Sequence, residues 1–141
     1  MTLSIHDVAE GDALTPMVIV ATATVIVAGA LATRDFMPVH HDKAYAESQG
    51  APDIFMNILS SNAYCSRFLT DWAGPEALVR RVAIRLGVPV FPNSTVTFTG
   101  TVTAVEVATA TVEVTLQAST DMGDHLTGTA VLRLPHEAAS S

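Results

Sequence analysis

The pattern of apolar and polar positions divides this chain into an apolar run, two helix-like stretches and a series of alternating runs. Residues 17–33, MVIVATATVIVAGALAT, carry no charge. Their valine, isoleucine and threonine content predicts one long buried strand, which Gly29 would allow to bend. The run approaches the length of a membrane span, but no Lys/Arg cluster flanks it, and we expect no membrane span. We expect residues 1–16 to form a polar lead-in that wraps over the body.

The middle of the chain has helical spacing. Asp42 is well placed to cap a short helix over residues 43–47, which Gly50 would end. A longer helix is predicted over residues 54–72, because apolar residues recur there at helical spacing and Gly74 and Pro75 follow. It is the one long amphipathic helix that the pattern predicts.

From Leu78 onward apolar and polar residues alternate, which predicts about four consecutive strands. They are expected over residues 78–90, 95–108, 109–119 and 125–134, with a hairpin turn at 121–124. An antiparallel sheet that is apolar on one face needs a cover, and the long helix is the available one. The sequence therefore predicts an α+β fold, a hot-dog, in which a curved antiparallel sheet wraps around one central helix. We expect a single domain over residues 1–141, with a frayed tail at 135–141.

Composition narrows the function. The net charge of −7 argues against a nucleic-acid groove, which needs clustered positive charge. The single cysteine, Cys65, excludes an internal disulfide and a thiolate zinc site, and we expect it to be a small buried side chain. An acidic beginning without the positive region of a signal peptide leads us to expect a cytoplasmic protein.

The candidate chemistry lies in RDFMPVHHDKAYAES, residues 34–48. Asp35 and His40 are five positions apart, so a tight turn could aim both at one water molecule. Consecutive residues rarely converge on one ion, so His40, His41 and Asp42 are not expected to bind metal. We expect His41 to face solvent or a backbone carbonyl. From the residues alone, a purely structural role for Asp35 and His40 stays open.

The stretch ALATRDFMPVHHDKAYAESQG resembles the signature of MaoC-like acyl dehydratases and (R)-specific enoyl-CoA hydratases, Asp-x-x-x-x-His followed by an aspartate-capped short helix. PDIFMNIL and LTDWAGPEALVRRVAIRLGVPVFPN resemble one branch, the small subunits of actinobacterial steroid side-chain enoyl-CoA hydratases. The resemblance implies Asp35 and His40 as catalytic residues, an acyl-CoA substrate, no cofactor and no metal. It also implies a second hot-dog subunit, in a heterodimer or heterotetramer and otherwise in a homodimer.

The chain departs from the family where most members carry His-Gly at the start of the central helix, because Met56 and Asn57 stand there. The resemblance implies that a backbone N–H of Asn57, or of its neighbour Met56, faces the thioester oxygen. We expect the asparagine side chain to narrow the approach or to add a hydrogen bond.

The basic residues Arg80, Arg81 and Arg85 fall in one predicted strand and could meet CoA phosphates, although a solvated strand face explains them as well. Two other functions stay open. One is a hot-dog thioesterase, for which Asp53 is the acidic candidate. The other is a non-catalytic partner subunit, which the presence of both Asp35 and His40 disfavours. A Ser-His-Asp triad is disfavoured, and His125 is a weak metal-ligand candidate.

Overall fold

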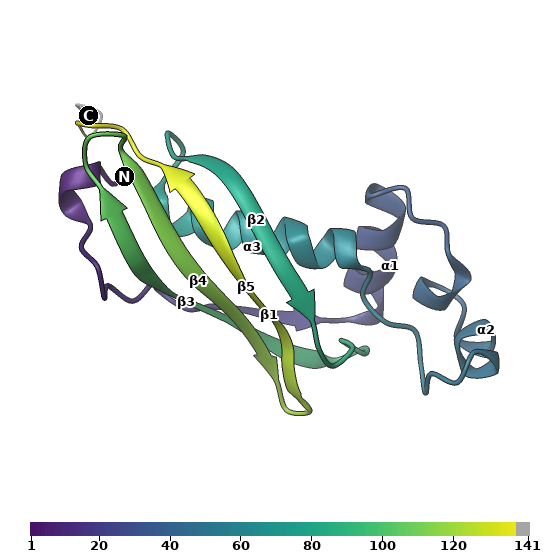
Figure 1. Ribbon diagram of the computed structural model, residues 1–141. Coiled ribbons are helices and arrows are strands. Elements are labelled where there is room, and N and C mark those ends of the chain that lie inside the picture. Colours follow the sequence, from purple (N-terminus) through teal and green to yellow (C-terminus); the bar gives the residue numbers. More distant parts are fainter. Residues whose placement is uncertain (138–141) are drawn as a thin grey trace.

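A computed structural model describes residues 1–137. One antiparallel sheet of five strands, in the order β1-β3-β4-β5-β2, packs on a long helix (Figure 1). The strands are β1 (Met17–Ala21), β2 (Leu78–Leu86), β3 (Ser94–Glu106), β4 (Thr111–Thr120) and β5 (Gly123–Arg133). The helices are α1 (Ala23–Ala32), α2 (Lys43–Ser48) and α3 (Ile58–Ala73), with single 3₁₀ turns η1 (Ile5–Asp7) and η2 (Pro38–His40). The predicted α+β hot-dog architecture is confirmed.

The alternating residues of the predicted strands form the sheet. In β4 the buried residues alternate with exposed ones, so one face is apolar and the other is polar. The buried set is Val112, Val114, Leu116 and Ala118. The turn between β4 and β5 lies at Asp121 and Met122, as predicted. This face of the sheet forms the core with α3.

Helix α3 covers the apolar face with a stripe of fully buried side chains. Cys65, Phe68 and Leu69 belong to it, and the Phe68 ring packs on Phe98 of β3 with 6.2 Å between centroids. Burial raises the pKa of the Cys65 thiol to about 11, which fits the predicted role of a small apolar side chain. Gly74, with φ 92°, ends the helix where the sequence predicts.

The prediction of one strand over residues 17–33 is wrong. The strand β1 stops at Ala21, and α1 follows directly. The Thr22 hydroxyl accepts a hydrogen bond from the Val25 N–H at 3.2 Å and caps the helix. Gly29 is not a bend in a strand. It lies where α1 meets α3, and a β-carbon there would collide with the Ser60 hydroxyl.

The long helix begins at Ile58 and not at residue 54. The segment before it is not helical, and its N–H groups are bonded elsewhere: the Met56 N–H donates to the Val90 carbonyl at 3.0 Å and the Phe55 N–H to the Val39 carbonyl at 3.3 Å. The Asn57 side chain then caps the helix by accepting the Ser60 N–H at 3.1 Å. Met56 and Asn57 therefore lie before the helix and not inside it.

The N-terminal segment and the residues directly after β5 lie along the body. Ile5, Val8 and Leu14 of the N-terminal segment are buried, and Ala13 bridges to Thr101 of β3, so the expected wrapping is confirmed. The Pro135 carbonyl accepts from the Ile5 N–H at 2.9 Å, whereas residues 138–141 of the expected frayed tail lie outside the described residues. Within residues 1–137, no helix is long and apolar enough to cross a membrane.

Candidate functional site

Beyond one end of the sheet, α1 lies beside the start of α3, and α2 lies farther out (Figure 1). A cavity of about 270 Å³ lies at this end of the helix. Both residues of the predicted catalytic pair line it, together with the segment that joins α2 to α3 and the segment that follows β2. The lining residues are Asp35, His40, Phe55, Met56, Asn57, Ile58, Leu86, Gly87, Val88, Pro89 and His125.

The structure brings Asp35 and His40 together. The His40 Nε2 lies 3.4 Å from the Asp35 Oδ2, and the His40 ring is buried except for about a tenth of its surface. The His40 Nδ1 lies 2.7 Å from the Phe55 carbonyl oxygen. Because a carbonyl only accepts, Nδ1 carries the proton and donates it. In the neutral ring Nε2 is therefore an acceptor, and it stands beside a second acceptor, the Asp35 carboxylate.

Asn57 holds the Asp35 carboxylate with its side chain. The Asn57 Nδ2 donates to the Asp35 Oδ2 at 3.0 Å and to the Thr33 Oγ1 at 2.9 Å. This amide, with smaller contributions from the Met37 N–H and the His40 ring, keeps the pKa of Asp35 below its usual value. The expectation that the asparagine side chain adds a hydrogen bond is therefore met, but the bond is made to the carboxylate.

The backbone donors at the start of α3 differ in availability. The Met56 N–H is engaged by the Val90 carbonyl at 3.0 Å. Within residues 1–137, no protein group accepts from the N–H groups of Asn57, Ile58 and Leu59, which are the donors that a helix start leaves open. Asn57 and Ile58 line the cavity. Of the two expected donors, Asn57 is the one with a free N–H in this arrangement.

The structure adds a residue that sequence reasoning missed. His125 of β5 lines the cavity and is 2% exposed. Its Nδ1 lies 2.7 Å from the Val88 carbonyl oxygen, and its Nε2 lies 2.8 Å from the Ser61 Oγ. The partners are 37 and 64 residues away in the chain, so no local motif could have revealed them.

The neighbours of the predicted catalytic pair have the expected structural roles. Asp42 caps α2 by accepting the Tyr45 N–H at 3.0 Å. The His41 Nε2 lies on the exposed side, 3.4 Å from the Phe36 carbonyl. Asp53 does not line the cavity, and it pairs at 3.8 Å with Lys43. Within residues 1–137, no group of three or more His, Cys, Asp and Glu side chains could hold a metal ion; that the protein uses none stays a prediction.

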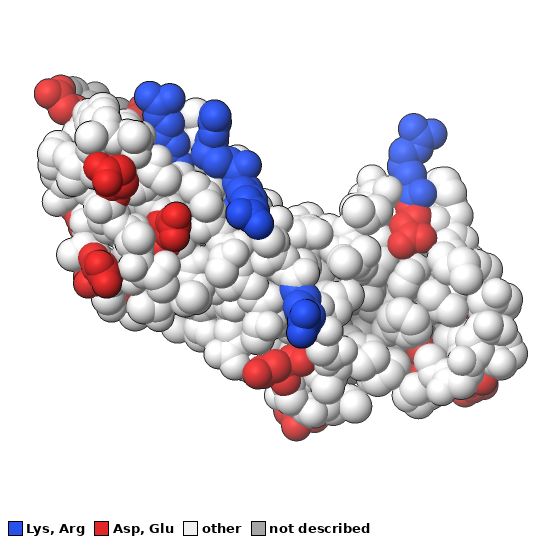
Figure 2. Space-filling view, in the orientation of Figure 1, with Lys and Arg blue, Asp and Glu red and all other residues white. Residues whose placement is uncertain are grey.

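The three arginines lie along the exposed edge strand β2, where basic side chains follow the strand (Figure 2). Arg85 precedes Leu86 of the cavity wall and borders a small hollow beside it. Arg80 is the extra residue of a bulge between Val79 and Arg81. At about 3.3 Å per residue, Arg80 and Arg81 lie roughly 17–20 Å from Leu86 along the strand. The structure thus brings Arg85 near the site but not the other two.

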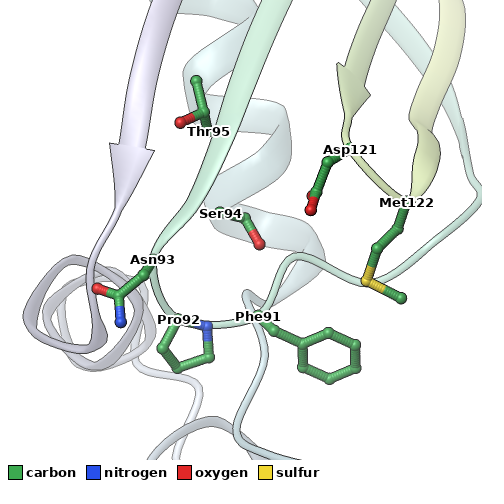
Figure 3. Close-up of a pocket in the computed structure, with 7 residues that line it drawn as sticks. All are labelled: Phe91, Pro92, Asn93, Ser94, Thr95, Asp121 and Met122. Carbon is green, nitrogen blue, oxygen red and sulfur yellow. The ribbon is translucent and has the colours of Figure 1, made fainter.

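A larger hollow of about 450 Å³ lies nearby, at the ends of β3 and of the β4–β5 hairpin, and Figure 3 shows its lining. The Asp121 carboxylate and the Ser94 hydroxyl point into it, and the Phe91 ring and Met122 border it. Phe91 packs edge-on against Phe55, which in turn packs edge-on against the His40 ring. No predicted site residue lines this hollow, and the Asp121 carboxylate disfavours a phosphate there.

Comparisons with known proteins point to one family. Residues 11–122 match the family model of the MaoC like domain. The chain is 46% identical over 124 residues to the 3-oxo-4,17-pregnadiene-20-carboxyl-CoA hydratase beta subunit of Mycobacterium tuberculosis, which covers 88% of this chain and 95% of that protein.

Solved structures of similar proteins have the same fold. A chain of the ChsH1-ChsH2 complex from Mycobacterium tuberculosis superposes with a TM-score of 0.86 at 44% identity, covering 89% of this chain and 98% of that one. The (R)-hydratase from A. caviae involved in PHA biosynthesis gives a TM-score of 0.83 at 24% identity, over 91% of this chain and 98% of that chain, and this second likeness concerns the fold alone.

Proposed function

Because the chain belongs to the MaoC-like family, we propose that it is a subunit of an enoyl-CoA hydratase, which adds water across the double bond of a 2-enoyl-CoA thioester. The observation that carries the proposal is the pair of acceptors, Asp35 Oδ2 and His40 Nε2, 3.4 Å apart at the cavity. Neither acceptor can donate to the other while the carboxylate is ionised and the ring is neutral. A water molecule can donate one proton to each, and its oxygen is then left free to attack.

The reaction follows from that arrangement. The water oxygen forms a bond to the β-carbon while one of its protons passes to the Asp35–His40 pair, and the double-bond electrons move toward the thioester carbonyl. The pair then gives a proton back to the α-carbon as the enolate electrons form the new C–H bond and the thioester carbonyl is restored, so one water is added and atoms and charge balance without a cofactor or a metal. Such positioned proton transfers typically contribute about 10²–10⁴-fold to the rate.

The start of α3 supplies the second requirement. Negative charge develops on the thioester oxygen during attack, and free N–H groups at a helix N-terminus stabilise it. We assign this role to the backbone N–H of Asn57, whose residue lines the cavity. The Asn57 side chain is occupied by Asp35, so one residue would serve the carboxylate and the oxyanion with different groups.

The acyl group and the assembly come by analogy with the relatives. We propose a steroid side-chain enoyl-CoA as the substrate, the class given by the name of the Mycobacterium tuberculosis relative. We also propose a second hot-dog subunit, because the similar structure from Mycobacterium tuberculosis is the ChsH1-ChsH2 complex. Large apolar side chains at the end of α1, in the loop after Asp35 and at the start of α3 support it, because they are exposed in one chain: Leu31, Phe36, Met37, Ile58 and Leu59. The buried, unpaired Cys65 is consistent with a reducing compartment, and we propose a cytoplasmic location.

The test is loss of enoyl-thioester absorbance, with the full chain alone and together with a co-expressed second subunit. A short 2-enoyl-CoA and a steroid side-chain enoyl-CoA are compared, in wild type and in His40→Ala. Turnover that disappears in His40→Ala is expected. Release of free thiol would instead indicate a thioesterase, and turnover unchanged in His40→Ala would reject the proposed mechanism.

A further inference from the structure

A second histidine borders the cavity of Asp35 and His40, and the proposed reaction does not use it. Resting on the proposed function, we infer that His125 is a positioning residue for the hydration reaction. With Ser61 it holds the segment of residues 86–89 at a fixed separation from the first turn of α3. This segment and the first turn of α3 are the two walls of the cavity that would enclose the thioester, and the two side chains keep the distance between the walls fixed.

The protonation of this pair follows from its partners. The Val88 carbonyl only accepts, so His125 Nδ1 donates to it across 2.7 Å. In the neutral ring Nε2 is then an acceptor, and the Ser61 hydroxyl donates to it across 2.8 Å. Burial lowers the pKa of His125, which favours this neutral form. Ser61 is fully buried, and its 3.3 Å approach to the Asn57 carbonyl is the longer of its two contacts.

The clamp joins both walls of the cavity. On one side the Val88 peptide is held twice, by its N–H to the Asp124 carbonyl at 2.9 Å and by its carbonyl to His125. On the other side Ser61 lies one turn after Asn57, the residue whose amide holds Asp35. Between residues 86–90 and residues 56–61, the only other bond found within residues 1–137 is Met56 N–H to the Val90 carbonyl. Loss of His125 or Ser61 would therefore leave one bond between them.

The pair is not a hydrolase dyad. Ser61 has no exposed surface from which to attack a substrate, and the His125 Nδ1 faces a backbone carbonyl and not a carboxylate. Both ring nitrogens of His125 are occupied by protein groups. Its effect on a reaction must therefore pass through the groups that it holds.

The experiment measures kcat and KM for enoyl-CoA hydration by the full chain, together with its second subunit where one is required. The variants are Ser61→Ala, His125→Leu, His125→Gln and the double variant Ser61→Ala/His125→Leu. His6→Gln, on an exposed histidine of η1, is the matched control. We expect kcat to fall by up to about 100-fold in Ser61→Ala and His125→Leu, with KM little changed, since small misplacements at a reacting centre cost rate.

Two further expectations separate positioning from mere stability. His125→Gln should recover part of kcat, because its amide can still bond to Val88 or Ser61. The double variant should be no slower than the worse single one, because the two residues act as one unit. Thermal unfolding of each variant is measured alongside, and ¹⁵N NMR of the wild-type ring should show a neutral histidine protonated at Nδ1.

The possible failures are distinguishable. Wild-type protein that does not hydrate either enoyl-CoA would reject the proposed function, and the positioning role with it, whatever the variants do. Active wild type with variants that unfold at lower temperature but keep kcat would leave the proposed function intact and overturn the positioning role. A His125 ring protonated at Nε2 or at both nitrogens would overturn the clamp itself.

Discussion

The two histidines of the cavity, His40 and His125, are bound alike on one side and differently on the other. Each ring directs Nδ1 to a backbone carbonyl at 2.7 Å, the Phe55 carbonyl for His40 and the Val88 carbonyl for His125. The His40 Nε2 lies beside the Asp35 carboxylate at 3.4 Å, whereas the His125 Nε2 is closed by the Ser61 hydroxyl at 2.8 Å. The same tautomer thus leaves one ring with an open acceptor and the other with none.

This difference shows that the second ring nitrogen decides what each histidine can do. A histidine can act as a general base only where a reacting proton can reach an unoccupied nitrogen. His40 meets this condition, because its Nε2 faces only the Asp35 carboxylate. His125 does not, so its contribution is to geometry. Four changes test this comparison, from the largest expected effect to the smallest.

Loss of the open acceptor pair should have the largest effect. We expect His40→Ala and Asp35→Asn each to lower kcat for enoyl-CoA hydration by about 10²–10⁴-fold, because each removes a proton-transfer group. Steady-state kinetics of the purified protein measure this loss. His41→Ala is the matched control, since His41 lies on the exposed side of the same loop. Equal losses in His40→Ala and His41→Ala would show that the loop and not the acceptor matters.

The Asn57 amide should matter next, because it holds the carboxylate of the pair. Asn57→Ser keeps an oxygen that can cap α3 but removes the donor to Asp35. We expect kcat to fall by roughly 10-fold, as for a lost hydrogen bond to a charged group. Unfolding temperatures close to wild type would show that the cap is retained. Asn57→Ala, which loses the helix cap as well, should be less stable than Asn57→Ser.

The same change should move the pH dependence in a defined direction. The amide keeps the pKa of Asp35 below its usual value, so the ionised carboxylate persists into acid. Its stabilising contribution is present above the unfolded pKa, about 3.9, and is lost as the pH falls through the lower folded pKa. Without the amide the folded pKa should rise, and the acid limb of kcat should move to higher pH. An unmoved acid limb in Asn57→Ser would exclude Asp35 as the titrating group.

The sheet could be predicted from the sequence because its signal is local. One buried and one exposed face produce strict alternation, as in β4, and no distant contact is needed to recognise it. Helix α1 could not be predicted in this way. It is apolar almost all round and rich in β-branched residues, so it has no helical period, and its own propensity favours a strand. Its packing on α3 through Gly29 overrides that propensity.

In the candidate site, too, the sequence predicts the residues that are close together in the chain and not those that depend on distant contacts. Asp35 and His40 lie in one short loop, so their spacing and the family resemblance sufficed to place them together. The predicted start of α3 is too early because apolar Phe55 continues the helical spacing of Ile58 and Leu59, although the backbone N–H groups of Phe55 and Met56 are bonded to distant segments. Asn57, a preferred capping residue, was the available signal for the true start. His125 gave no signal, because both of its partners come from remote segments.

A change at the contact of α1 with α3 should affect the Asp35–His40 pair and not His125, because α1 leads into the loop that carries Asp35. We expect Gly29→Ala to destabilise the protein by about 1–3 kcal/mol, as overpacking does, since its β-carbon would collide with the Ser60 hydroxyl. That hydroxyl is buried and has no partner within residues 1–137, so Ser60→Ala should be nearly neutral. Denaturant unfolding measures both.

In the double variant, the effect of Gly29→Ala on stability should change sign. In a Ser60→Ala background the collision is removed, and Gly29→Ala should stabilise the protein by up to about 1 kcal/mol, because alanine is the better helix former. Equal destabilisation in both backgrounds would contradict the proposed contact. Hydration by Gly29→Ala should fall while the ring tautomer of His125 is unchanged, since the other wall of the cavity is untouched.

The smallest effect on hydration is expected at Arg85, the arginine next to the cavity wall that His125 holds. Its guanidinium is exposed, so a contact with a CoA phosphate should be worth no more than about 1 kcal/mol, and Arg85→Ala should raise KM by at most about 5-fold. The effect should shrink as salt is added, because exposed charges are screened. Arg80→Ala is the control, since Arg80 lies on the same strand roughly 20 Å from Leu86 of the cavity wall. An equal, salt-sensitive rise of KM in both variants would mean that the charge of the whole strand attracts CoA, and that the position of Arg85 beside the cavity is irrelevant.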